Sequence, residues 1–161
     1  MSRLSLFLAA LLATVACSPV AAQELTLRWL GESGAVLAEE LMSVEDIEAL
    51  QQQVIVTHTP WADGAQTFSG PLLATLANLA GLPVVEAALV ALNDYSAKIP
   101  QSDWALYGII MAVRQDGEEM RIRDKGPFRI VYPVDAYPAL TSHLYHSRMI
   151  WQIRSIDFRV E

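Results

Sequence analysis

Cysteine is almost absent from this sequence, because Cys17 is the only one among 161 residues. Cys17 lies within residues 1–22, which we predict to be a secretory signal peptide. If that peptide is removed, the remaining domain, residues 23–161, has no disulfide, no thiolate nucleophile and no thiolate metal ligand. The mature domain is therefore expected to lack every chemistry that needs a cysteine.

The signal-peptide prediction depends on residue types near the N-terminus. Arg3 is the only charged residue before the apolar run 4–16, which has about the length of a signal-peptide core and is too short for a membrane span. Val20 and Ala22 supply the small residues expected before a cleavage site. The predicted location is the periplasm, and a lipoprotein anchored through Cys17 is the alternative.

Basic residues are scarce as well. Loss of Arg3 leaves ten Lys and Arg against 18 Asp and Glu, a net charge of −8, and we see no basic cluster. Nucleic-acid binding is therefore not expected. The mature chain has no apolar run long enough for a transmembrane segment. It also lacks a Ser-His-Asp pattern, a Gly-rich phosphate loop and an HExxH helix, so hydrolase and nucleotide-binding functions have no support.

The mature chain contains many short strands. Leu25, Leu27 and Trp29 alternate with polar residues, which is the period of a half-buried strand. Further strands are predicted in VIVTHTP, VEAALVAL, IIMAVR, EEMRIR, FRIVYPV and RMIWQIRSIDFRV. Turns are predicted at Asn93-Asp94 and Asp116-Gly117. The apolar parity of the last strand shifts near Arg154-Ser155, which indicates a β-bulge or a change of sheet.

Few helices are predicted. In SVEDIEALQQQ, Ser43 is the expected N-cap and Asp46 stands three residues later. FSGPLLATLANLAGLP is predicted to be a helix capped by Ser69, with Pro71 in its first turn. The segment around Tyr137, Pro138, His143 and His146 is expected to be a loop. We assign the chain to the α+β class, with a mixed, largely antiparallel sheet.

Four of these segments together resemble the oxidoreductase molybdopterin-binding domain family, which includes the sulfite oxidases. They are FSGPLLATLANLAGLP, ALNDYSAKIP, IIMAVRQDGEEM and GPFRIVYPV, which are similar to the family's helix ending in glycine, Tyr-Ser turn, Asp-Gly hairpin and Gly-Pro-x-Arg strand. The resemblance implies a sulfite oxidase-like fold and a molybdopterin cofactor. It covers most of residues 54–133.

The segment THTPW departs from the family pattern. In catalytic members a cysteine thiolate before the Gly-x-x-Leu helix binds molybdenum, and Thr57 stands in that place here. A threonine hydroxyl is not a soft anionic donor and does not replace a thiolate. We therefore expect a domain without molybdenum, and no cofactor is certain.

Arg129 is the candidate residue with the most specific chemistry. A guanidinium keeps its charge in a protein, so an inward-pointing Arg129 needs an anion, a carboxylate or water. One hypothesis is a structural ion pair with an acidic residue such as Asp94 or Asp135. The other is anion binding, because the resemblance implies that the strand arginine contacts the phosphate end of the pterin. Both hypotheses remain open at this point.

Other candidates come from the loops around these segments. Ser147 and Arg148 stand where the family has a Lys-rich loop. His143 and His146, with His58 elsewhere, have no cysteine or carboxylate nearby in sequence, so we assign no metal site. The complete set of predicted cofactor-binding or ligand-binding residues is Thr57, His58, Trp61, Asn93, Asp94, Tyr95, Arg129 and Arg148. No catalytic residue is assigned.

These residues favour an exported module that binds a small anion or another small ligand, in a sensory or accessory role. One alternative is an active molybdopterin-dependent oxidoreductase without a protein thiolate ligand. The other is a structural partner of another periplasmic protein, which predicts an exposed apolar patch between Tyr137 and Trp151 instead of a pocket.

Overall fold

The structure is a computed structural model that describes residues 23–161. The predicted signal peptide, residues 1–22, and the possible lipid anchor at Cys17 lie outside the described residues. Within residues 23–161, none of the helices has the length and apolar character needed to cross a membrane.

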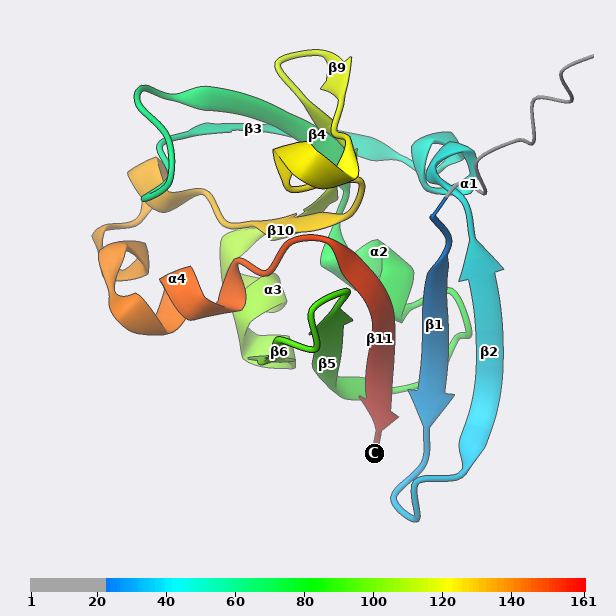
Figure 1. Ribbon diagram of the computed structural model, residues 1–161. Coiled ribbons are helices and arrows are strands. Elements are labelled where there is room, and N and C mark those ends of the chain that lie inside the picture. Colours follow the sequence, from blue (N-terminus) through cyan, green and yellow to red (C-terminus); the bar gives the residue numbers. More distant parts are fainter. Residues whose placement is uncertain (1–22) are drawn as a thin grey trace, which may run out of the picture.

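Five strands form the larger sheet (Figure 1), in the order β2 (Val36–Met42), β1 (Leu25–Leu30), β11 (Ile153–Val160), β5 (Val84–Ala91) and β6 (Ser96–Pro100). The first strand, β1, runs parallel to the last, β11, and the other neighbours are antiparallel. The predicted α+β class with a mixed, largely antiparallel sheet is confirmed.

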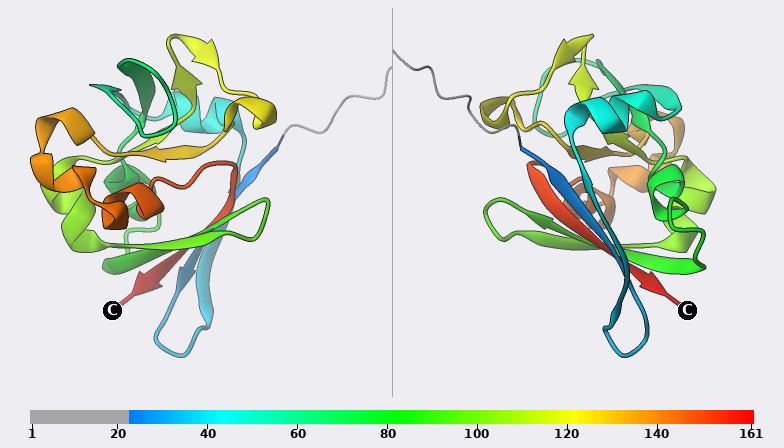
Figure 2. Two further views of the ribbon diagram at one scale, coloured as in Figure 1. Left: turned by 60° about the vertical axis from the view of Figure 1, so that its left-hand side comes forward. Right: turned by 90° about the vertical axis from the view of Figure 1, so that its right-hand side faces the viewer.

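One face of the larger sheet carries the core. Leu25, Leu27 and Trp29 are fully buried, as their alternation predicts. The Trp29 and Phe158 rings pack 5.4 Å apart between neighbouring strands, and Trp29 Nε1 donates to the Ala77 carbonyl at 2.8 Å. Figure 2 shows the helices on that one side of the sheet, with the other side open.

Two smaller sheets lie above this core. One has the strand order β3 (Gln52–Thr57), β4 (Gln66–Pro71), β8 (Arg114–Gln115) and β9 (Glu118–Glu119), and the other pairs β10 (Arg129–Val131) with β7 (Ile110–Ala112). Figure 1 shows β10 running between the four-stranded sheet and the larger sheet. Because β10 carries Arg129, this interior strand places the arginine in the middle of the molecule.

The helices are short: α1 (Val44–Ala49), α2 (Leu73–Ala77), α3 (Gln101–Tyr107), α4 (His143–Arg148) and the 3-10 turns η1 (Ile122–Asp124), η2 (Val134–Ala136) and η3 (Pro138–Thr141). The cap of α1 is confirmed. Ser43 Oγ accepts from the Asp46 N–H at 3.1 Å, and the Asp46 carboxylate accepts from the Ser43 N–H at 2.9 Å. These hydrogen bonds from Ser43 hold the pKa of Asp46 below its ordinary value.

The helix predicted to begin at Ser69 is wrong in its first part. Ser69 and Pro71 belong to strand β4, and α2 begins only at Leu73. Strand β4 pairs with β3 on one side and with β8 on the other, and Phe68 within it is fully buried. Sheet pairing outweighs the local helix signals here, because it satisfies the backbone and buries Phe68 at the same time.

The C-terminal segment differs from its prediction in one respect. The expected loop around Tyr137 and His146 contains η3 and α4. The predicted bulge is confirmed, because the register between β11 and β5 shifts between Ile153 and Ser155. The bulge changes which face the apolar side chains of the strand occupy.

Gly70 provides a test of how β4 packs on β7. A Cβ at Gly70 would overlap the Met111 carbonyl and the Ala112 Cα, which are backbone atoms that have no rotamer to change. We expect Gly70→Ala to lower the free energy of unfolding by about 3 kcal/mol or more, measured by urea denaturation. Gly31→Ala is the control, because its Cβ would lie 3.6 Å from the Leu37 side chain, an ordinary contact. Equal stability of the two variants would contradict the close approach of β4 and β7.

Candidate functional site

Arg129 is buried without a polar partner. Its side chain extends from β10, only 2% of the residue is exposed, and Nε and Nη2 are enclosed with no hydrogen-bond partner within residues 23–161. The guanidinium carbon lies 4.9 Å from the Phe68 ring centre and 5.8 Å from that of Trp61. The two rings give partial cation–π compensation, but they do not accept the N–H groups as an oxyanion does.

The ion-pair hypothesis for Arg129 is wrong, because Arg129 forms no ion pair with any residue between 23 and 161. Asp94 pairs with Arg154 at 2.7 Å, and Asp135 pairs with His58 at 2.8 Å. Burial away from water lowers the pKa of Arg129 to about 10. Arg129 therefore remains a cation at neutral pH, and the anion-binding hypothesis is the one that the local structure leaves open.

Arg129 lines a cavity of about 420 Å³, which we call the polar cavity. Four basic and three acidic side chains line it. The basic ones are Arg121, Arg123, Lys125 and Arg129, and the acidic ones are Glu118, Glu119 and Asp124. Arg121 and Arg123 both approach Asp124, at 2.7 and 3.8 Å. Among the described residues, Lys125 and Arg129 form no ion pair, so two cations of this cavity are free to meet an anion.

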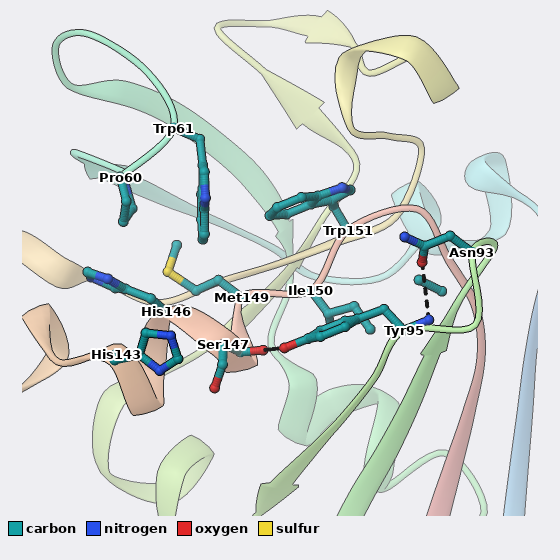
Figure 3. A pocket seen from close by; sticks show the side chains of 11 residues that line it. Pro60, Trp61, Asn93, Tyr95, His143, His146, Ser147, Met149, Ile150 and Trp151 are labelled. Atoms are coloured by element: carbon teal, nitrogen blue, oxygen red, sulfur yellow. Dashed lines mark hydrogen bonds between the residues drawn. The ribbon is translucent and has the colours of Figure 1, made fainter.

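A second, larger cavity of about 640 Å³ adjoins the same tryptophan, and we call it the aromatic cavity. The Trp61 and Trp151 rings meet edge to face, 4.9 Å apart at 72°, on one side of it (Figure 3). On another side, Tyr95 donates from its hydroxyl to the Ser147 carbonyl at 2.9 Å, and the Asn93 side chain accepts from the Tyr95 N–H. The cavity walls are largely apolar.

The two tryptophans connect the two cavities. Trp61 lines both of them. Trp151 lines the aromatic cavity, forms a β-bridge with Arg129, and has the Lys125 ammonium 6.0 Å from its ring centre. A change of charge at Arg129 or Lys125 therefore acts directly on a ring that faces the aromatic cavity.

The structure separates the predicted site residues into two groups. Trp61, Asn93, Tyr95 and Arg129 line one or both cavities. The others line neither, and are Thr57, His58, Asp94 and Arg148.

Thr57 and His58 anchor the end of β3 to η2. Thr57 is fully buried, and its hydroxyl accepts from the Asp135 N–H at 3.1 Å. The Asp135 carboxylate accepts from the His58 N–H at 3.1 Å and lies 2.8 Å from His58 Nδ1. The side-chain contact with His58 holds the pKa of Asp135 below its ordinary value. The place expected for a metal ligand is thus occupied by a structural contact.

Arg148 belongs to a buried polar network that holds α4 in place. Its Nη1 donates to the Asp103 carboxylate at 2.7 Å, and the Tyr132 hydroxyl donates to the same oxygen at 2.7 Å. Burial raises the pKa of Tyr132, and the hydrogen bond to Asp103 adds to the effect. Because α4 lines the aromatic cavity, this network supports one of its walls.

Sequence reasoning missed the basic side chains that accompany Arg129. Arg121, Arg123 and Lys125 lie within five residues around η1, so the expectation of no basic cluster is wrong at this place. The spacing R-I-R-D-K was a visible signal. The predicted strand EEMRIR is wrong in its second half, because β9 ends at Glu119 and the 3-10 turn η1 follows, which brings these basic side chains to the cavity.

No family model matches the sequence, and no curated protein matches it either. Among solved structures, the sulfane dehydrogenase SoxCD from Paracoccus pantotrophus is similar, with a TM-score of 0.60 and 13% sequence identity. The similarity covers 86% of this chain and 38% of that one. The fold is that of the sulfite oxidase-like molybdopterin proteins. At this identity the likeness shows the fold alone, and the present chain spans well under half of the length of that protein.

The residues that the structure describes do not fit a molybdenum centre held by protein sulfur. Residues 23–161 contain no cysteine, and Thr57 is buried away from both cavities. The same part of the chain has no group of three His, Cys, Asp or Glu placed to hold a metal ion. The free guanidinium of Arg129 does fit an anionic group such as a phosphate.

The stability of the ligand-free protein tests whether Arg129 is unpaired. Burial lowers the pKa of Arg129 to about 10 in the folded state, below its ordinary value, so its charge destabilises the fold at neutral pH, and this effect is relieved only as the pH rises above about 10. We expect Arg129→Met to raise the free energy of unfolding at pH 7 by about 1–3 kcal/mol, measured with urea in low salt. Arg28→Met, which breaks the partly exposed ion pair with Asp157, is expected to lower it slightly. A loss of stability in Arg129→Met larger than in Arg28→Met would contradict the unpaired state.

Proposed function

We propose that the protein is an exported module that binds a small anion in the polar cavity through Arg129, in a sensory or accessory role and without molybdenum. The observation that carries the proposal is the buried, unpaired guanidinium on β10. Natural folds pair buried charges, because an uncompensated one is strongly destabilising. A bound anion supplies the missing partner.

The geometry around Arg129 supports an anionic ligand over a neutral one. Lys125 is a second cation without an ion pair in the described part of the chain, and it lines the same cavity. The whole chain carries a net charge of −7, so this local excess of positive charge runs against the overall charge. A buried cation does not contribute to the surface charge that keeps a protein soluble, so solubility does not explain Arg129, and a binding role does.

Trp61 supports the sensory part of the proposal. Its ring lies beside the Arg129 guanidinium and lines both cavities. An anion that binds Arg129 withdraws positive charge from the face of Trp61. Binding is thereby coupled to the aromatic cavity and to tryptophan fluorescence.

Calorimetric titration with sulfate, phosphate and pyrophosphate tests anion binding, with tryptophan fluorescence as a second readout. We expect the wild-type protein to bind at least one of these anions and Arg129→Met to bind it about tenfold or more weakly, because a charge-assisted hydrogen bond contributes about 1.5–3 kcal/mol. Arg154→Met is the matched control, since Arg154 is half exposed, pairs with Asp94 and lines neither cavity. Equal affinity of the wild type and Arg129→Met, or no binding of any of the three anions, would contradict the proposal.

The alternative function is a molybdopterin-dependent oxidoreductase without a protein thiolate ligand. It is favoured by the sulfite oxidase-like fold and by the fit of Arg129 to a phosphate. Elemental analysis of the full chain, expressed in a cell that makes molybdopterin, separates the two functions. We expect molybdenum far below one equivalent, because the cavities offer no thiolate. One equivalent of molybdenum would favour the enzyme.

A purely structural partner role has less support. That hypothesis predicts an exposed apolar patch between Tyr137 and Trp151 and no pocket. In that segment, Tyr137 and Leu144 are the exposed large apolar side chains, whereas Met149 and Ile150 are buried against the aromatic cavity.

A further inference from the structure

One wall of the aromatic cavity carries three metal-ligating side chains at regular spacing. His143 and His146 belong to α4, and Met149 follows its last turn. Residues three apart on a helix point to the same side, and all three line this cavity. Figure 3 shows the side chains of His143, His146 and Met149 on the α4 side of this cavity.

These donors are free to bind. Within residues 23–161, neither imidazole forms a side-chain hydrogen bond or an ion pair, whereas His58 is engaged by Asp135. Met149 is 1% exposed, so its position is fixed by packing. His146 meets the Trp61 ring edge to face at 6.3 Å, which holds its ring at the cavity wall.

The chemistry of the set selects a soft, singly charged cation. No carboxylate or thiolate lines this cavity, so it lacks the carboxylate ligands typical of Mg²⁺ and Ca²⁺ sites and the anionic ligands common in zinc sites. Thioether and imidazole are donors that suit copper(I). We propose that His143, His146 and Met149 bind one copper(I) ion in the aromatic cavity.

The surroundings suit such an ion. Three neutral ligands leave a single positive charge on the ion, and the cavity around it is largely apolar, with Trp61 and Trp151 among its lining residues. Arg129 and Lys125 line the polar cavity and do not line this one. The copper ligands and the anion-binding cations are different residues, so either proposal stands if the other fails, although the two cavities share Trp61.

Anaerobic titration with copper(I), in competition with the chelator bicinchoninate, tests the site in the chain 23–161 purified without metal. We expect one equivalent to bind with quenching of tryptophan fluorescence. His146→Gln and Met149→Leu are each expected to weaken binding about tenfold or more. Silver(I), which has the same ligand preference without redox chemistry, is expected to bind in the same pattern.

Matched controls exist for both ligand types. His58→Gln removes a histidine outside the cavity, and Met42→Leu removes a buried methionine of β2, so neither is expected to change copper affinity. Circular dichroism establishes which variants fold. If a ligand variant does not fold, X-ray absorption of the copper-loaded wild type decides the question, because the proposal requires one sulfur and two imidazole nitrogens. Binding that is unchanged in Met149→Leu, a copper spectrum without sulfur, or no binding by the wild type would overturn the proposal.

Discussion

The free guanidinium of Arg129 is the constraint on which the rest of this account depends. The fold brings β10 between two sheets, so its arginine is enclosed by Phe68 and Trp61, and the nearest expected carboxylates are committed to other partners. A buried charge without a partner destabilises the fold, and a bound anion compensates it. A polar cavity at that guanidinium, with a second free cation at Lys125, supplies the place for this compensation.

Distant parts of the chain build the site together. The loop after β3 contributes Trp61, β10 contributes Arg129, and the segment before β11 contributes Trp151. The Trp61 and Trp151 rings contact each other, so the two cavities share a wall whose electrostatics changes with the charge beside it. The fold is sulfite oxidase-like, but Thr57 stands where a sulfur ligand is expected. Its hydroxyl accepts a hydrogen bond from the Asp135 N–H and so holds η2 in place.

The sequence predicts those elements whose conformation is determined by neighbouring residues. The alternation of β1, the capping box at Ser43 and the bulge after Ile153 depend on neighbouring residues, so the sequence indicates them. The sequence predicts a helix where Gly70 lies in strand β4, because this conformation depends on the close approach of β7, which no local pattern encodes. The inward position of Arg129 was predictable from its apolar neighbours. Its lack of a partner was not, because Asp94 and Asp135 are committed by contacts with distant residues.

The central claim is that the buried guanidinium of Arg129 has no partner of its own and meets an anion. The resonance of its Nε–H group in a nitrogen-15 NMR spectrum, assigned by its absence in Arg129→Met, reports on this directly. We expect the resonance to shift in a saturable manner as phosphate is added in low salt, while that of Arg154 stays unchanged. A resonance of Arg129 that does not respond, or that already reports a hydrogen bond to a carboxylate of the chain, would contradict the account.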